Sequence, residues 1–287
     1  MHREKANSQK NRLRTKIGSV LVKLVLLFFV VIALFPLAWM LISSIKPTSE
    51  LFSVPPTVIV KNPTLDSYAR VLFESPIPRS FLNSLFISVV ATGITLLVAI
   101  LAGYGFARFR FQGNKPLSTA LLFGQMMPAV VLLVPLYRIF SAIGFIDTYR
   151  VNIVVNVAVS VPMAVLTLTG FISSIPRELD EAAMIDGCGR TKVLYHIILP
   201  VIKPGIVTAG IFAFLNTWEE FMFAYNFTNA SKYKTLSIAV REFEGQFQID
   251  WGAMMSAAVI ISIPVLLLFL LCNKYFIKGI TSGAVKG

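Results

Sequence analysis

The chain contains 287 residues, of which 56% are hydrophobic and only 14% are charged. A typical soluble domain carries roughly 25% charged residues. The composition therefore excludes a disordered chain and an ordinary soluble fold. The net charge is +12, and a charge of this size is found both in nucleic-acid-binding proteins and in membrane proteins. The position of the basic residues along the chain distinguishes the two.

Long apolar runs occur along the whole chain. A helix needs about 20 consecutive apolar residues to cross a bilayer. Five runs of this length contain no Asp, Glu, Lys or Arg, and a sixth is interrupted only by Glu219 and Glu220. We therefore predict an all-α membrane protein with six transmembrane helices. The predicted spans are Leu24–Ile45, Ser80–Ala107, Pro116–Tyr137, Val151–Pro176, Pro204–Tyr225 and Trp251–Asn273.

The basic residues follow these spans. If the N-terminus is cytoplasmic, the inner segments hold 17 Lys and Arg and the outer loops hold nine. The positive-inside rule then places both termini in the cytoplasm. Because this bias accounts for the net charge, we expect no nucleic-acid partner. The predicted organisation is a basic N-terminal tail (residues 1–23), a six-helix transmembrane domain (24–273) and a C-terminal tail (274–287).

The sequence offers little that could perform catalysis. It contains no G-x-x-x-x-G-K-[ST] loop for ATP phosphates, no H-E-x-x-H and no G-x-S-x-G. The two histidines, His2 and His196, and the two cysteines, Cys188 and Cys272, do not have the spacing of metal ligands. We expect no metal, no cofactor and no enzyme site on this chain, which makes a membrane enzyme the weakest of the functions considered.

The third predicted cytoplasmic loop, residues 177–203, is richer in pattern than a linker. Glu178–Asp186 is predicted to form a short helix, because acidic residues in a first turn suit the helix dipole. Gly187 can adopt the positive φ that often ends a helix. Arg190–Ile198 is predicted to form a second short helix that stops at Pro200. Together these segments predict a bent cytoplasmic elbow.

This elbow resembles the EAA loop of ABC importer permeases at every signature position. Other segments share the resemblance, among them Asn83-Ser84, Ser44-Ile45-Lys46-Pro47 and Gly103 to Arg108. Together they are similar to the shorter, MalG-type subunit of carbohydrate importers. The elbow residues that match the signature are Glu181, Ala182, Ala183, Gly187, Ile197, Ile198, Leu199 and Pro200.

The resemblance implies a type I ABC importer permease fold in a bacterial inner (plasma) membrane. Such a permease pairs with a second homologous permease, two cytoplasmic ATPase subunits and an extracytoplasmic sugar-binding protein. The elbow residues would then transmit ATPase movement to the membrane helices. The implied function is ATP-driven, alternating-access import of an oligosaccharide or polyol-type solute. The missing P-loop agrees with an ATPase carried on separate chains.

The fifth predicted span holds a second candidate site. A carboxylate near the centre of a membrane helix costs about 2.5–3.5 kcal/mol on insertion scales. The presence of Glu219 and Glu220 in this span therefore indicates a structural or functional role. Consecutive helix positions point about 100° apart, so one of the two acids could face a central path and the other the interface or a neighbouring helix. Asn216, Trp218 and Glu219 could bind a sugar, since hydroxyls suit carboxylate and amide acceptors and CH faces suit an aromatic ring. The same residues could instead stabilise a subunit interface or an outer gate.

Other interpretations stay open at this point. Gln125, Asn152 and Asn156 are weaker path candidates, since each could equally join helices by hydrogen bonds. The main alternative function is an ion-coupled carrier or channel that uses Glu219 and Glu220 to bind a cation or proton. The sequence does not identify the transported solute.

Overall fold

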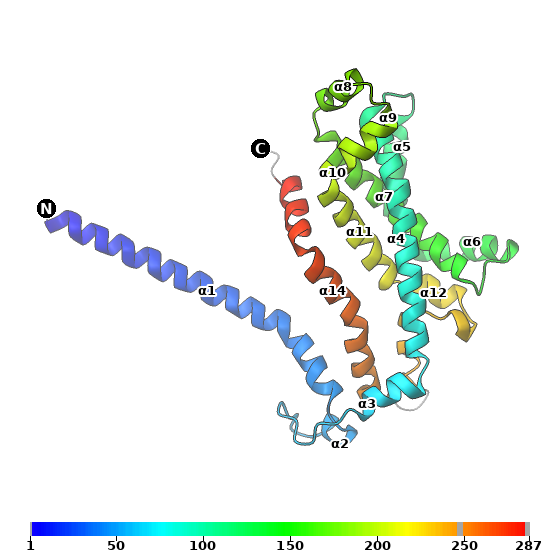
Figure 1. Ribbon diagram of the computed structural model, residues 1–287. Coiled ribbons are helices and arrows are strands. Elements are labelled where there is room, and N and C mark those ends of the chain that lie inside the picture. The colour runs from blue at the N-terminus through cyan, green and yellow to red at the C-terminus, as the bar shows by residue number, and fades with distance from the viewer. Residues whose placement is uncertain (1, 246–248, 285–287) are drawn as a thin grey trace. The chain divides into compact units, whose positions relative to one another are not determined.

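The computed structural model describes the backbone of residues 2–245 and 249–284 and the side chains of residues 18–245 and 249–272. All regular elements in these ranges are helical, which confirms the predicted all-α fold (Figure 1). The longer helices are α1 (His2–Ser44), α4 (Ile77–Arg108), α5 (Asn114–Met126), α6 (Ala129–Ala142), α7 (Tyr149–Ser173), α11 (Lys203–Trp218) and α14 (Trp251–Ala284). The shorter ones are α2 (Thr48–Leu51), α3 (Asp66–Ala69), η1 (Arg70–Glu74), α8 (Arg177–Ile185), α9 (Arg190–Val193), η2 (Leu194–Ile198), α10 (Leu199–Val201), α12 (Met222–Phe227), η3 (Ser231–Tyr233) and α13 (Leu236–Arg241). The side chains of 1–17 and 273–287, which include most of both predicted tails, lie outside the described residues.

Four described helices are long and apolar enough to cross a membrane by themselves, and the number rises to six if each of two bent helix pairs is one span. Each of the four contains most of one predicted span, so these four predictions are confirmed. They are Gly18–Ser44, Ile77–Arg108, Tyr149–Ser173 and Trp251–Cys272.

The third predicted span is not one straight helix. Helices α5 and α6 meet at a bend of 100° between Met126 and Ala129. The break has a local cause, because a residue before proline is pushed out of the helical region. Met127 precedes Pro128 and is extended, with φ −72° and ψ 128°. The span predicted over Pro116–Tyr137 is therefore corrected to a broken pair.

The fifth predicted span is also corrected. Its helix, α11, begins at Lys203 and ends at Trp218, well before the predicted end at Tyr225. Glu220 then starts a new helix, α12, by accepting backbone hydrogen bonds from Phe223 and Ala224. At its start, α11 meets the segment Arg190–Val201 at a bend of 78°.

The chain divides into two compact units. One comprises residues 1–73 and 249–260, and the other comprises 74–248 and 261–287. In the first unit, hydrogen bonds gather where α1 ends. The Ser44 and Tyr68 hydroxyls lie 2.8 Å apart, the Ser256 hydroxyl donates to the Ser44 carbonyl, and the Thr64 N–H donates to Ile45. These bonds join three separate stretches of sequence.

In the second unit, α4, α7 and α11 pack against one another. The approach of α11 to α7 is close at Gly205, where an added Cβ would lie 2.6 Å from the Phe171 ring. Small residues allow helix backbones to approach in lipid, where the hydrophobic effect does not drive association. The three helices form the scaffold that carries both candidate sites.

Candidate functional site

The elbow, residues 177–203, lies at one end of α4 and α7 (Figure 1). Its first helix, α8, matches the predicted helix to within one residue at each end. Glu178 and Asp180 occupy the first turn, where acids interact favourably with the helix dipole. Only Asp180 and Ala183 of α8 are buried, so the helix is fixed along one narrow face.

Gly187 ends α8 in the predicted left-handed conformation, with φ +83°. The Gly187 N–H donates to the Met184 carbonyl at 3.1 Å, and the Cys188 N–H donates to the Ala183 carbonyl at 2.9 Å. This pair of bonds is the Schellman motif, which satisfies carbonyls at a helix end. Apart from Gly187 and its chain neighbours, no atom of the described residues lies within 4 Å of where a Cβ on Gly187 would be, so the glycine is required by backbone conformation alone.

The second half of the elbow differs from the prediction in one respect. Helical structure does not stop at Pro200 but continues through α9, η2 and α10 to Val201. The residues before the proline form a wide turn, in which the Leu199 N–H donates to the Leu194 carbonyl. A wide turn relieves the clash that a proline ring ordinarily makes with the preceding turn.

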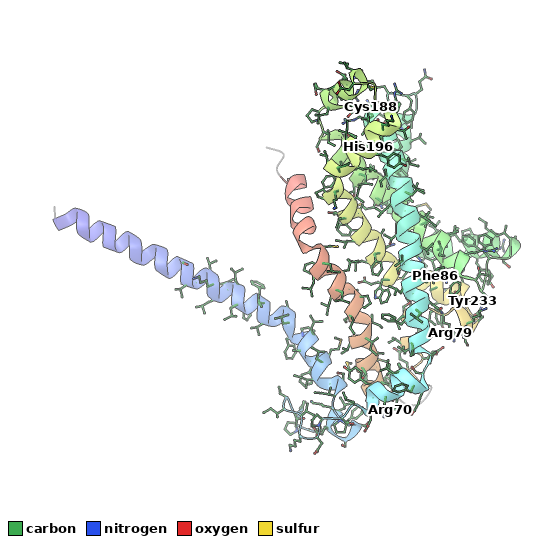
Figure 2. All side chains as sticks on the ribbon, viewed as in Figure 1. Arg70, Arg79, Phe86, Cys188, His196 and Tyr233 are labelled. Atoms are coloured by element: carbon green, nitrogen blue, oxygen red, sulfur yellow. The ribbon has the colours of Figure 1, made fainter. Side chains whose placement is uncertain are left out.

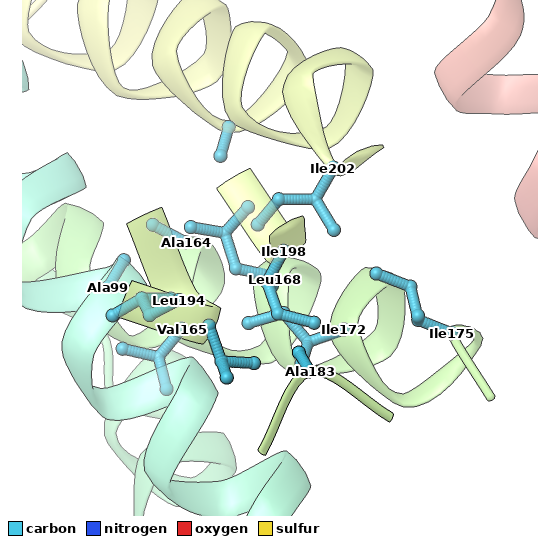
Figure 3. Packing of buried hydrophobic residues seen from close by; sticks show 12 residues of the cluster. Ala99, Ala164, Val165, Leu168, Ile172, Ile175, Ala183, Leu194, Ile198 and Ile202 are labelled. Carbon is cyan, nitrogen blue, oxygen red and sulfur yellow. The ribbon is translucent and has the colours of Figure 1, made fainter. Parts of the chain in front are cut away.

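The elbow shares a hydrophobic core with the membrane helices (Figure 3). Leu194, Ile198 and Ile202 are almost completely buried from the elbow side. Val165, Leu168 and Ile172 of α7 and Ala99 of α4 belong to the same cluster. Ile197 and Leu199 pack at its margin, and Pro200 is exposed. Burial of several large apolar side chains, each worth about 1.5–3 kcal/mol, makes the elbow an extension of the bundle.

A buried ion pair fastens α8 to the end of α4. The Arg108 Nε lies 2.7 Å from Asp180 Oδ2, and its Nη2 donates to Asp180 Oδ1 at 3.3 Å. The third guanidinium nitrogen donates to the Ile175 carbonyl at 3.1 Å. The two side chains are only 7% and 10% exposed. A two-point contact of this kind fixes direction as well as distance.

The opposite face of α8 is open. Glu181 and Ala182 are exposed, and three apolar side chains of the same helix are exposed with them. Leu179 is 46% exposed, Met184 43% and Ile185 86%. An apolar patch around a carboxylate on a short, firmly held helix has the character of an interaction surface.

The second candidate site lies at the end of α11. Trp218 is buried, stacked on Phe214 at 5.7 Å and edge-on to Phe81 at 5.6 Å between ring centres. Glu219 directly follows the helix and is exposed. The Glu220 carboxylate accepts N–H groups of α12, and its carbonyl accepts the Ser237 hydroxyl. The four predicted path residues thus have different surroundings.

A cavity of about 630 Å³ lies beside α7 and α11. Its lining is mostly apolar, and Gln125, Ser160 and Asn216 are among its polar residues. The Asn216 amide donates to the Ser160 hydroxyl at 3.2 Å. Asn152 and Asn156 are buried instead, and their amides donate to Thr228 and to the Asn152 carbonyl. Of the predicted path residues, Asn216 and Gln125 therefore line the cavity.

Residues 95–282 match the family model described as binding-protein-dependent transport system inner membrane component. The chain belongs to this family. Its members are transport components of a membrane and not catalytic enzymes, which agrees with the membrane spans of the structure.

Several relatives in the family are similar over nearly their whole length. The chain is 34% identical to the sulfoquinovosyl glycerol transport system permease protein SmoH of Agrobacterium fabrum, over 88% of this chain and 89% of that protein. It is also 34% identical to the trehalose/maltose transport system permease protein MalG of Thermococcus litoralis, over 90% and 93%. The fold is similar to a chain of a bacterial ABC transporter that imports alginate, with a TM-score of 0.77, 17% identity and coverage of 91% and 97%. The resemblance to sugar-transport permeases is thereby confirmed.

The structure gives a role to Asn83-Ser84, which the sequence marked only as part of the resemblance. The Asn83 amide donates to the carbonyls of Lys232 and Lys234, and its oxygen accepts the Tyr149 hydroxyl at 2.8 Å. Ser84 accepts the Leu236 N–H at 2.8 Å. These residues hold the segment between α12 and α13 against α4. Figure 2 shows Tyr233 of this segment near Phe86, away from Cys188 and His196 of the elbow.

Proposed function

We propose that this permease is one of two homologous membrane subunits of an ATP-binding cassette importer for a carbohydrate. Support for the substrate class comes from its relatives, whose names specify sulfoquinovosyl glycerol and trehalose/maltose. The transported solute would be an oligosaccharide or a polyol-type molecule. The partners would be a second permease, two cytoplasmic ATPases and an extracytoplasmic sugar-binding protein. A solved alginate transporter of similar fold was crystallised with a periplasmic protein that holds an alginate pentasaccharide.

The orientation is part of the proposal. With 17 of 26 basic residues on one side, both termini and the elbow would lie in the cytoplasm of a bacterial cell. The elbow would then face the ATPases, and the segment between α12 and α13 would face the binding protein.

The observation that carries this function is the two-sided character of α8. One face is joined to α4 and α7 through Asp180 and Ala183, while Glu181, Ala182 and Ile185 remain exposed. A helix held in this way can transmit movement without bending. ATPase subunits docked on the exposed face would thereby rotate the membrane helices, so that the path opens alternately to the two sides.

Glu181→Lys tests the coupling. Charged hydrogen bonds contribute about 1.5–3 kcal/mol, so charge reversal should weaken ATPase recovery roughly tenfold or more and abolish uptake. The measurement is copurification of ATPase subunits from membranes, with uptake of labelled sugar in the same cells. Glu74→Lys, at an exposed carboxylate outside the elbow, is the matched control and should leave both unchanged. Normal ATPase recovery and normal uptake in Glu181→Lys would refute docking at this surface.

We also propose that Glu219 and Asn216 face the transport path, while Trp218 and Glu220 hold that region in shape. Glu219→Gln should then raise the apparent KM for the sugar or change which sugars compete, with assembly unaffected. Glu220→Ala should lower the amount of assembled complex, because two buried N–H groups lose their acceptor at about 1–3 kcal/mol each.

Sugar competition, assembly and ATP dependence, measured on both variants, distinguish the possibilities. Reduced assembly with unchanged selectivity in Glu219→Gln would exclude substrate contact. Uptake that persists without any ATPase, and that loses its ion dependence in Glu219→Gln, would support an ion-coupled carrier instead.

A further inference from the structure

Lys46 has an unusual setting in the unit formed by residues 1–73 and 249–260. It lies just after the end of α1, and its side chain is almost fully buried, with the residue 3% exposed. The ammonium donates to the Thr57 carbonyl and lies 5.0 Å from the centre of the Trp39 ring. A carbonyl and an aromatic face stabilise a cation only in part.

The charge of Lys46 has no direct counterion among the described residues. The ion pairs seen there include those of Arg70, Arg108, Lys234 and Arg241, each with a carboxylate partner, and none of these pairs involves Lys46. Glu50 is near in sequence, but its carboxylate accepts the N–H groups of Lys61 and Asn62. Burial of a charge is costly unless the charge is paired. A ligand with a negative group would therefore be stabilised beside Lys46.

The same side chain lines a cavity of about 260 Å³. The walls combine two tryptophans and other apolar side chains with Lys46 and Glu50. Trp251 is 40% exposed, so the cavity opens at the surface of this unit. Residues of the lining include Trp39, Lys46, Glu50, Phe52, Trp251 and Met255.

The position of the cavity identifies the class of ligand. The apolar span Gly18–Ser44 ends two residues before Lys46. A residue this close to the end of a membrane span is expected at the level of the membrane–water interface. Tryptophans gather at this level, and Lys or Arg interacts there with lipid headgroups. Most side chains of the span itself are exposed, so acyl chains can lie along it.

We propose that this cavity binds the headgroup of a phospholipid, with the phosphodiester paired to Lys46 and the glycerol and upper acyl carbons against Trp39 and Trp251. The buried ammonium supplies the charge, and the aromatic rings supply the apolar walls. The bound lipid compensates a buried cation, so it stabilises the region where α1, the loop after it and the start of α14 meet.

Native mass spectrometry of the full-length chain tests the site. With phosphatidylglycerol as the probe, the wild-type chain should retain lipid after delipidation, and Lys46→Gln should bind it roughly tenfold more weakly because a charged hydrogen bond is lost. Lys46→Arg should recover part of the binding. Lys61→Gln, an exposed lysine in the same loop, is the matched control and should bind as the wild type does.

Two further probes distinguish binding of a lipid phosphate from binding of free inorganic phosphate. Inorganic phosphate at millimolar concentration should not displace the lipid, and diacylglycerol, which lacks phosphate, should not be retained. If Lys46→Gln fails to fold, Trp251→Leu provides the second variant, since this half-exposed ring lines the cavity without carrying charge. Equal retention by wild type, Lys46→Gln and Trp251→Leu, or displacement by inorganic phosphate, would overturn the proposal.

Discussion

Arg108→Glu should detach the elbow from α4 and abolish transport. The substitution places a carboxylate beside buried Asp180 and removes the donor to the Ile175 carbonyl. Loss of one partner from a buried pair costs about 3–5 kcal/mol, and like charges add to this cost. Most of the effect should fall on coupling, because α4 itself packs along its length on α7 and α11. Uptake of labelled sugar and thermal unfolding of the purified chain measure the two effects.

A charge exchange makes this test specific. The double variant Arg108→Glu with Asp180→Arg restores opposite charges and should recover part of the stability and uptake lost in Arg108→Glu. Arg110→Glu reverses an exposed charge two residues away and should be nearly silent, since exposed pairs contribute about 0–1 kcal/mol. If the single, double and control variants all transported normally, the ion pair would have no part in coupling.

The importance of Arg108 could not be derived from the sequence. Composition and run length predicted four spans closely, because apolar length is a local property. Asp180 stands 72 positions further along the chain, and only the packing of α8 against α4 brings the two together. The sequence pattern placed Arg108 at the end of a motif but contained no signal for its partner. The tertiary fold therefore adds the connection between two segments that were each recognised separately.

Local chemistry explains the breaks that the sequence prediction missed. Apolar runs show where a chain can enter a membrane, but they do not show whether it does so as one straight helix. Met127-Pro128 breaks the third span through the restriction on a residue before proline. Pro200, in contrast, was expected to end a helix and does not, because a wide turn precedes it. Proline therefore breaks the helix at position 128 and does not break it at position 200.

The candidate path residues show a related limit of prediction from sequence. Two adjacent acids on a helix were expected to face different surroundings, but the sequence did not show which acid faces which; in the structure Glu220 caps α12 while Glu219 is exposed. This division depends on the end of α11 at Trp218, which hydrophobicity does not reveal. Gly187 is the opposite case, because a glycine between two short helices predicted a positive φ from the local pattern alone.

Gly187→Val should uncouple the elbow while the protein still inserts into the membrane. A left-handed conformation costs an ordinary residue roughly 1–2 kcal/mol, and a β-branched residue more. Relief of that strain requires the turn to open, which breaks the bonds from Gly187 to Met184 and from Cys188 to Ala183. The exposed face of α8 would then no longer hold a fixed direction. We expect uptake to be lost and membrane levels to stay near those of the wild type.

A graded series at this position separates backbone strain from crowding. Beyond the adjacent residues, no described atom lies within 4 Å of an added Cβ, so side-chain size by itself should have little effect. Asn adopts the left-handed conformation more readily than other residues, and Gly187→Asn should therefore retain the most uptake, Gly187→Ala less and Gly187→Val least. Gly189→Val is the matched control, because Gly189 has equally open space but φ of −69°. If Gly189→Val abolished uptake as fully as Gly187→Val, or if Asn were no better than Val, the turn conformation would not be what couples the elbow.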